Sequence, residues 1–288
     1  MKQRFLFSIF SLVCASYLFS QEKTFKPVSF PKDYQSQIDV IYTQVNGWDG
    51  RMDLYTNPTA KTPTPVVINI HGGGWNHGEK ESQTGFGSWF KNGYAVANVE
   101  YRLVDVAPAP AAIEDVRCAL IYLLKNAKSL NIDPDNIVIM GGSSGGHLAL
   151  MAGLLGNDKR FDTNCHYDGT IKAAAIIDKY GVTDLLPLAK WKSAKNWLGT
   201  HYNNQKFVES VSPLYHINKQ SPPTFIVHGD ADPIVPYLQS VVLHEKLKTH
   251  GVKTEFLTIP GGVHGKFSEE QNALLSKRMW DFLNNLGL

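Results

Sequence analysis

The sequence predicts one α/β domain whose mostly parallel sheet is covered by helices on both faces. Short apolar runs, typical of buried strands, alternate along the chain with segments whose apolar residues recur at helical spacing. An early run is followed by the turn signals Asn46-Gly47 and Asp49-Gly50, which predict a hairpin and so antiparallel strands at the N-terminal edge. The 288 residues fit one large domain as well as two small ones, and we expect one because no repeat or low-complexity linker divides them.

The strands are predicted from apolar runs that are bounded by turns or prolines. The hairpin pairs residues 38–45 with 51–56, and a proline-punctuated loop separates it from the next run at 65–70. The remaining strands are expected at 94–99, 137–140, 171–177, 224–228 and 254–259.

Helices are predicted between these strands. Apolar residues recur at helical spacing from Ile113 to Leu124, after two prolines that suit a loop leading into a helix. Further helices are expected at 147–155, 237–250 and 268–286. Residues 181–218 are longer than a simple connection and carry aromatic rings at Trp191, Trp197 and Tyr202. We therefore expect a small helical insertion after the sixth strand that forms a cap or substrate wall over the sheet.

Composition excludes several classes of function. Hydrophobic residues make up 43% and charged residues 19% of the chain, which are ordinary values for a globular protein. The formal net charge is +2 and no long basic run occurs, so we expect no nucleic acid as a partner. No Cys-x-x-Cys motif or His/Cys cluster indicates a metal, and we expect neither a metal nor a cofactor.

The N-terminus is typical of a secretory signal peptide. Lys2 and Arg4 precede an apolar run at 5–19 that is too short for a comfortable membrane span. We expect cleavage after residue 20, so that residues 1–20 form the signal and 21–288 the catalytic domain. This predicts a secreted or periplasmic protein without stable membrane insertion, and an uncleaved anchor is the alternative. Lipidation at Cys14 is disfavoured because Val13 occupies a position that normally requires a small residue.

Removal of the signal leaves two cysteines, Cys118 and Cys165. In an oxidising compartment they could pair, and the alternative is two separate buried thiols. The sequence does not define their geometry, and we favour free thiols.

Residues 141–146, Gly-Gly-Ser-Ser-Gly-Gly, directly follow the predicted strand at 137–140. A serine hydroxyl is a weak nucleophile that needs a nearby base. In a sharp strand-to-helix turn, glycines flank such a serine because side chains would clash there, and the helix N-terminus favours developing negative charge. The pattern G-x-S-x-G fits in two registers, which name either Ser143 or Ser144 as the nucleophile.

Residues 71–75, His-Gly-Gly-Gly-Trp, follow the predicted strand at 65–70. Consecutive glycines let backbone amides approach a ligand closely, which is what the oxyanion of a tetrahedral intermediate requires. A flexible turn is the alternative interpretation. We expect His71 to brace this loop rather than act as a base. Trp75 is expected either to line the pocket or to pack in the core.

A candidate acid and a candidate base follow two later strands. Asp232 comes after the strand at 224–228, next to Asp230, which we interpret as a turn-forming residue. His264 lies in a glycine-rich loop after the strand at 254–259. A carboxylate in such a place would orient an imidazole and stabilise its charged form. Ten histidines occur in the chain, and the following ones lack this context, so we interpret them as surface or packed residues: His201, His216, His228 and His250.

Together these segments resemble the hormone-sensitive-lipase branch of the α/β-hydrolase superfamily. Residues 143–149, Ser-Ser-Gly-Gly-His-Leu-Ala, are similar to the S-A-G-G-[HN]-L-A stretch of that branch, with Ser144 in place of alanine. Residues 71–74 resemble its HGGG oxyanion loop and residues 228–236 its HGxxDxxVP segment. The resemblance covers about residues 38–286. It implies that Ser143 is the nucleophile, Asp232 the acid and His264 the base.

The same resemblance implies the rest of the site. The oxyanion donors would be the backbone amides of Gly73, Gly74 and Ser144, and we expect Trp75 and Tyr180 to contact the substrate. The nearest known types are secreted bacterial carbohydrate esterases that act as acetyl xylan or feruloyl esterases. They imply an exported serine carboxylic ester hydrolase that removes acetyl groups, and also feruloyl groups, from xylan-type polysaccharides. Its partner would be an acylated polysaccharide or a small ester.

Three other functions stay open. An arylformamidase-like amidase also carries an HGGxW loop, but the signal segment argues against it because that metabolism is usually intracellular. A general short-chain carboxylesterase would use the same residues. A non-catalytic binding protein on a hydrolase scaffold is disfavoured because such proteins usually lose the serine, the acid or the histidine, and all three places are filled here.

Overall fold

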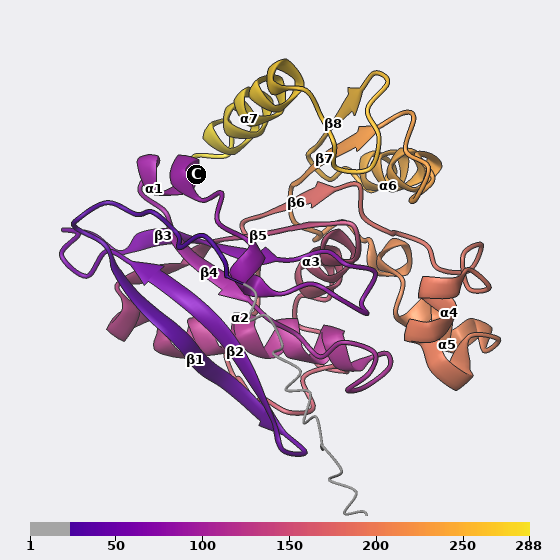
Figure 1. Cartoon of the computed structure of the whole chain (residues 1–288), viewed down its shortest axis with the longest axis horizontal. Coiled ribbons are helices and arrows are strands. Elements are labelled where there is room, and N and C mark those ends of the chain that lie inside the picture. Colours follow the sequence, from indigo (N-terminus) through magenta and orange to yellow (C-terminus); the bar gives the residue numbers. More distant parts are fainter. Residues whose placement is uncertain (1–23) are drawn as a thin grey trace, which may run out of the picture.

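The computed structural model describes residues 24–288, and the predicted signal at 1–20 lies outside the described residues. One eight-stranded sheet runs through the domain in the order β1-β2-β4-β3-β5-β6-β7-β8 (Figure 1). Its strands are β1 (Gln35–Val45), β2 (Trp48–Thr56), β3 (Thr64–Ile70), β4 (Ala95–Val99), β5 (Ile132–Gly142), β6 (Ala175–Lys179), β7 (Thr224–Gly229) and β8 (Thr254–Ile259). The hairpin β1–β2 and the pair β2–β4 are antiparallel, and all other neighbours are parallel. The predicted fold class is thus confirmed.

The central strands are apolar because both of their faces are covered. All five residues of β4 and all six of β7 are buried. The parallel register aligns Ile70 of β3 with Gly141 of β5, and Gly142 of β5 with Lys179 of β6. The carboxyl ends of these strands therefore meet at one edge of the sheet, which is where α/β folds bind their ligands.

Helices divide into two layers, one on each face of the sheet. The buried residues of α2 (Ala111–Leu130), α3 (Ser144–Leu154) and α6 (Leu238–Thr249) join one apolar core. Those of α1 (Gly87–Lys91) and α7 (Glu269–Asn284) join the other (Figure 1). A capping box at Ser268 and Gln271 fixes the start of α7. Within residues 24–288, the structure contains no helix with the length and apolar character that a membrane span requires.

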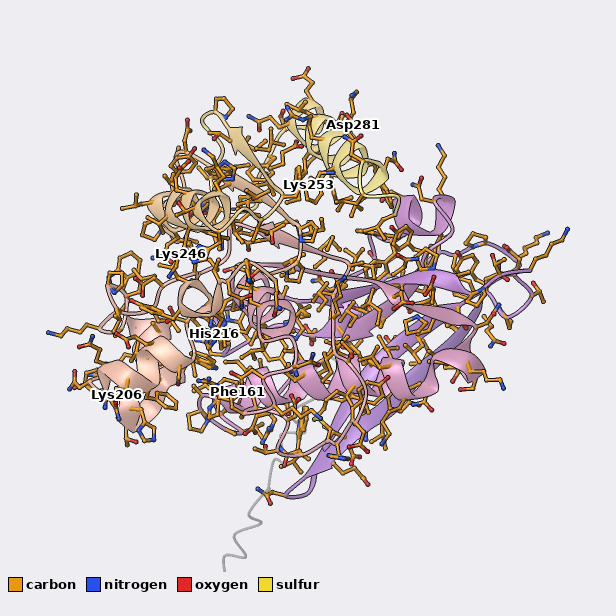
Figure 2. All side chains as sticks on the ribbon, turned by 180° about the vertical axis from the view of Figure 1, so that it is seen from behind. Phe161, Lys206, His216, Lys246, Lys253 and Asp281 are labelled. Carbon is orange, nitrogen blue, oxygen red and sulfur yellow. A yellow bond between two sulfur atoms is a disulfide. The ribbon has the colours of Figure 1, made fainter. Side chains whose placement is uncertain are left out.

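The predicted helical insertion after the sixth strand is present. It consists of α4 (Lys192–Leu198), η2 (Gly199–His201), α5 (Gln205–Ser210) and η3 (Pro213–His216). Lys206 of α5 lies on the opposite side of the molecule from Asp281 of α7 (Figure 2). Trp197 anchors the insertion because its ring is fully buried.

Most element boundaries differ from the sequence prediction by one to five residues, and the cause is clear for two of them. The sixth strand begins at Ala175 rather than at Ile171, although Ile171 is buried. An apolar run does not distinguish a strand from a buried connection that leads into it. Among residues 24–288, a single backbone hydrogen bond, from Ala174 N–H to Ile137 O (2.8 Å), ties the connection to the sheet. Helix α3 begins at Ser144, three residues before the predicted start. The prediction started too late because Gly145 and Gly146 have a low helix propensity.

The expectation of free thiols is wrong, because Cys118 and Cys165 form a disulfide. Cys118 lies on α2 and Cys165 in the loop after α3, with their Cα atoms 5.5 Å apart. The loop is held beside α2 by a buried ion pair in which Arg117 Nε donates to Asp162 Oδ1 at 2.8 Å. This long-range contact brings the two cysteines together, and their spacing of 47 residues in the sequence does not reveal it.

Candidate active site

Ser143 lies at the turn between β5 and α3. Its backbone has φ 57° and ψ −124°, a strained conformation of the kind found at functional turns. The flanking glycines permit the turn: a Cβ on Gly141 would lie 2.1 Å from Gly145 O, and a Cβ on Gly145 would lie 2.2 Å from Ile70 O. The two serines of the motif differ in environment. Both border the same cavity, but Ser143 is partly exposed, whereas Ser144 is buried with its hydroxyl 3.5 Å from that of Tyr101.

Asp232 and His264 form a short hydrogen bond across the loops that follow β7 and β8. His264 Nδ1 lies 2.6 Å from Asp232 Oδ2. The other oxygen, Oδ1, accepts the backbone N–H groups of Ile234 (2.7 Å) and Val235 (3.0 Å). Burial alone would raise the pKa of the Asp232 carboxyl, but the two amides and His264 together lower it below its usual value. Asp232 is therefore a carboxylate that fixes the orientation of the His264 ring.

His228 supports the same carboxylate from inside the domain, a role that the sequence interpretation missed. Its Nε2 lies 3.1 Å from both Asp232 Oδ2 and Val235 O, and its Nδ1 lies 2.8 Å from Ser240 Oγ. Two acceptors at Nε2 place the proton there, so Nδ1 accepts from the Ser240 hydroxyl. Burial lowers the pKa of His228 and keeps it neutral. The signal that could have revealed this role is its position four residues before Asp232, at the end of a buried strand.

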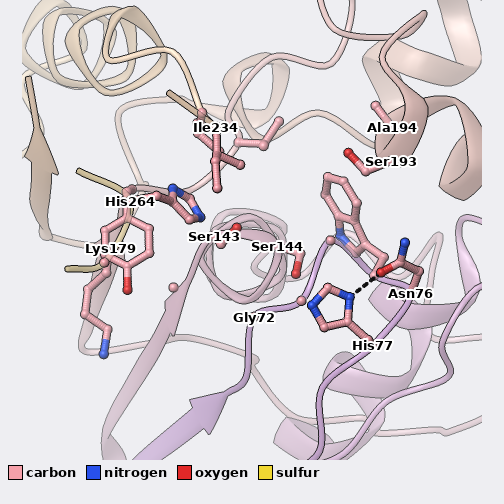
Figure 3. A pocket seen from close by; sticks show the side chains of 18 of the residues that line it. Gly72, Asn76, His77, Ser143, Ser144, Lys179, Ser193, Ala194, Ile234 and His264 are labelled. Atoms are coloured by element: carbon pink, nitrogen blue, oxygen red, sulfur yellow. Dashed lines mark hydrogen bonds between the residues drawn. The ribbon is translucent and has the colours of Figure 1, made fainter. Parts of the chain in front are cut away.

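His264 and Ser143 line one cavity of about 600 Å³ at the carboxyl ends of the strands. Figure 3 shows the imidazole of His264 directed toward the side of the cavity where Ser143 lies. Within the described residues, no hydrogen bond joins the Ser143 hydroxyl to the ring, and such bonds are often long until substrate binds. Tyr180 packs edge-on against His264, with ring centroids 4.8 Å apart, and also lines the cavity.

The glycine-rich loop after β3 lies directly against the Ser143 turn. A Cβ on Gly72 would lie 3.4 Å from Ser143 Cβ, and a Cβ on Gly73 would lie 1.9 Å from His77 O. Gly73 (φ 126°) and Gly74 (φ 57°) both have backbone conformations that favour glycine. Across residues 24–288, neither of their amides donates to another protein group. The amide of Ser144 is at the first position of α3 and has no intrahelical acceptor. Three amides that line the cavity are thus free to bind an anion.

His71 braces this loop, as its position suggests. It is buried, its Nδ1 lies 2.8 Å from Gly72 O, and its ring stacks on Tyr101 with centroids 4.3 Å apart. Burial lowers the pKa of His71, so the ring is neutral and Nδ1–H donates to the carbonyl.

Trp75 combines the two roles that the sequence left open, since it lines the cavity and is also 98% buried in the core. Its ring stacks on Trp197 of α4 at 4.8 Å, and its Nε1 donates to His147 Nδ1 at 3.3 Å. His147 in turn donates from Nε2 to Val211 O at 2.8 Å. Burial lowers the pKa of His147 to about 4, which keeps the ring neutral for both bonds. This cluster joins the glycine loop, helix α3 and the insertion.

The wall of the cavity formed by residues 181–218 is mainly apolar. Its apolar side chains are Val182, Leu185, Leu188, Trp191 and Ala194. No group of three or more potential metal ligands occurs within residues 24–288.

Residues 52–247, which make up more than half of the chain, match the sequence profile of the family BD-FAE. The chain belongs to the BD-FAE family. The matched range contains Ser143 and Asp232 and ends before His264. The place of His264 in the site therefore rests on its hydrogen bond to Asp232.

Solved structures similar to this BD-FAE chain are α/β-hydrolase esterases. A truncated carbohydrate esterase from gut microbiota is 27% identical with a TM-score of 0.77, over 90% of this chain and 99% of that one. The acetyl ester-xyloside bifunctional hydrolase of Caldicellulosiruptor lactoaceticus is 25% identical with a TM-score of 0.72, over 83% and 90% of the two chains.

Curated relatives of the BD-FAE chain include esterases of Mycobacterium tuberculosis. LipQ is 28% identical over 80% of this chain and 58% of its own length, and LipM is 30% identical over 73% and 51%. The chain thus spans about half the length of the mycobacterial relatives that it matches.

Proposed function

We propose that this protein is a serine carboxylic ester hydrolase in which Ser143 is the nucleophile, His264 the general base and Asp232 the acid that orients it. The observation that carries the proposal is the 2.6 Å bond between His264 and Asp232, at the rim of a cavity that Ser143 also lines. Because Nδ1 of His264 donates to the carboxylate, its Nε2 is left as the atom that can accept a proton. The esterase relatives support the same reaction class.

The proposed reaction has two stages. His264 takes the proton of Ser143 as the hydroxyl attacks the ester carbonyl, and the amides of Gly73, Gly74 and Ser144 bind the oxyanion. The proton then passes to the leaving alcohol, and an acyl ester remains on Ser143. Water, deprotonated by His264, attacks this ester, releases the acid and restores the serine.

The substrate that we propose is an acylated polysaccharide of the xylan type, with acetyl removal as the main reaction and feruloyl release as a further one. Two of the similar structures support this choice, since they are named as a carbohydrate esterase and an acetyl ester-xyloside hydrolase. Aromatic rings of Tyr180 and the exposed Trp191 line the cavity and offer surfaces for a sugar or phenolic ring, whereas Trp75 borders the cavity with little exposed surface. Action on such a polymer agrees with the export that the N-terminal sequence predicts.

Two measurements test this proposal. Ser143→Ala should reduce hydrolysis of p-nitrophenyl acetate to background and abolish labelling by a fluorophosphonate probe, while Ser144→Ala, the matched control, keeps both. If Ser144→Ala is the inactive variant, the assigned nucleophile is wrong. A panel of acetylated xylan, methyl ferulate and N-formylkynurenine then separates the polysaccharide esterase from an amidase. Turnover of small esters alone would favour a general carboxylesterase, and absence of probe labelling in the wild type would indicate a binding protein.

A further inference from the structure

Lys179 places a cationic side chain beside the Ser143 turn. It is the last residue of β6, it pairs with Gly142 of β5, and its carbonyl accepts the backbone N–H of Ser143 at 2.9 Å. Its side chain lines the cavity. Figure 3 shows Lys179 and Ser193 on opposite sides of Ser143, with the Lys179 ammonium at the end of a side chain that extends away from the serine.

The ammonium group of Lys179 has no counter-ion in the described part of the chain. No hydrogen bond or ion pair engages it there, although the side chain is largely withdrawn from solvent. Burial lowers the pKa of this lysine. The described lining of the cavity contains a second cation, the exposed Lys266, and neither Asp nor Glu.

A second buried lysine, Lys80, lies outside the cavity and differs from Lys179 in its partners. The ammonium of Lys80 lies 2.9 Å from Asp39, 2.9 Å from Asp53 and 2.6 Å from Glu81. Burial alone would lower the pKa of Lys80, but these three carboxylates raise it. A buried charge is costly unless it is paired, so a lysine that faces a reaction cavity without a carboxylate is suited to pair with an anion that enters the cavity.

We propose that Lys179 binds a carboxylate of the substrate at its own end of the cavity, so that the cavity favours esters with an acidic group several bonds away from the cleaved one. The carboxylate can belong to the acyl chain, as in a dicarboxylic half-ester, or to the sugar, as in an acetylated uronic acid. This inference rests on the proposed function of Ser143. Charge-assisted hydrogen bonds between an ammonium and a carboxylate are stronger than neutral ones, and a partly desolvated pair is screened less by salt than a surface pair.

Matched pairs of substrates test the proposal. For the acyl chain, kcat/KM is compared between p-nitrophenyl hemisuccinate and the neutral p-nitrophenyl butyrate. For the sugar, it is compared between an acetylated methyl glucuronoside and the acetylated methyl glucoside. We expect the wild type to prefer the acidic member of at least one pair by about tenfold or more, as expected for one charge-assisted hydrogen bond. The pair that shows the preference identifies the source of the carboxylate.

The variant Lys179→Met should reduce that preference to about one, and Lys179→Glu should reverse it. Lys190→Met, an exposed lysine outside this cavity, is the matched control and should keep the wild-type ratio. The ratio of two substrates on one variant cancels changes that affect all hydrolysis. Equal kcat/KM within both pairs in the wild type, or a preference that survives Lys179→Met, would overturn the inference.

A binding measurement separates failure of this inference from failure of the proposed function. Calorimetry on Ser143→Ala, which has no turnover to complicate it, should show tighter binding of methyl glucuronoside or succinate than of methyl glucoside or butanol. The difference should disappear in the double variant with Lys179→Met. An anion site present in a protein that hydrolyses no ester would refute the esterase proposal alone. Ester hydrolysis without anion binding would refute the role of Lys179 alone.

Discussion

Replacement of Asp232 by Asn tests the arrangement of the candidate site most directly. Oδ1 accepts two backbone N–H groups, from Ile234 and Val235, so the oxygen of the new amide must occupy that position. Its NH₂ group then replaces Oδ2 and faces His264 Nδ1 and His228 Nε2. A donor at this point forces Nδ1 of His264 to be the acceptor and moves the ring proton to Nε2, the nitrogen that should take the proton of Ser143.

The expected loss is large for activity and smaller for stability. A base held in the wrong tautomer should lower kcat on the order of 10⁴-fold, which corresponds to about 5 kcal/mol of transition-state stabilisation. The second N–H of the new amide faces the N–H of His228, which keeps Val235 O as its acceptor. This amide donor is therefore unsatisfied, and an unsatisfied buried donor costs about 1–3 kcal/mol of unfolding free energy. In a domain of this size each kcal/mol lowers Tm by ~2–4 °C. The variant should therefore remain folded at room temperature.

The assay measures kcat/KM for p-nitrophenyl acetate together with Tm. Asp230→Asn is the matched control, because Asp230 is exposed and its carboxylate accepts the N–H of Gly261 at 2.7 Å, a bond that an amide oxygen can keep. We expect this control to change activity by less than about threefold, as surface substitutions usually do. If Asp232→Asn keeps more than a tenth of the wild-type activity, the assignment of Asp232 as the orienting acid is refuted.

Two further predictions concern stability. Burial raises the pKa of Asp178 to about 7 from 3.8, and its Oδ2 has no partner within residues 24–288. Because the pKa in the folded state is above that of the unfolded chain, the folded protein binds the proton more tightly, and its unfolding free energy should fall by about 3 kcal/mol as the pH rises from about 4 to 7. Asp178→Asn should flatten the decrease of Tm between these pH values, and an unchanged slope would contradict the assignment. The disulfide between Cys118 and Cys165 closes a loop with a sequence separation of 47 residues, so the double variant with Ala should lose about 4 kcal/mol in urea unfolding. A loss below about 1 kcal/mol would show that the Arg117–Asp162 pair alone holds the loop.

The parts of the molecule that the sequence predicted well are those encoded by contiguous residues. The Ser143 turn is one example, because the strand before it, the glycines around it and the helix after it all lie within residues 132–154. The loop at 71–75 is another. Each motif follows a strand, and parallel strands end at the same edge, so their convergence follows from the topology.

The features that the sequence did not predict depend on contacts between distant segments. The disulfide requires the loop after α3 to fold back on α2, and nothing local to Cys165 encodes that. His228 looked like a residue of the strand core, and its bond to Asp232 depends on the way the turn after β7 closes. The sequence also did not predict that the Lys179 ammonium has no counter-ion among residues 24–288, because the elements that pack around a lysine decide whether it has one.

The contact between Trp75, His147 and Trp197 has a consequence for protein engineering. The indole of Trp75 in the glycine loop stacks on the indole of Trp197 in α4, and His147 links Trp75 to Val211 by two hydrogen bonds. The position of the glycine loop therefore depends on the insertion. Replacing residues 181–218 by a foreign segment to change selectivity would also displace the backbone amides proposed to bind the oxyanion. A successful chimera should therefore exchange Trp75 and His147 together with the transplanted segment.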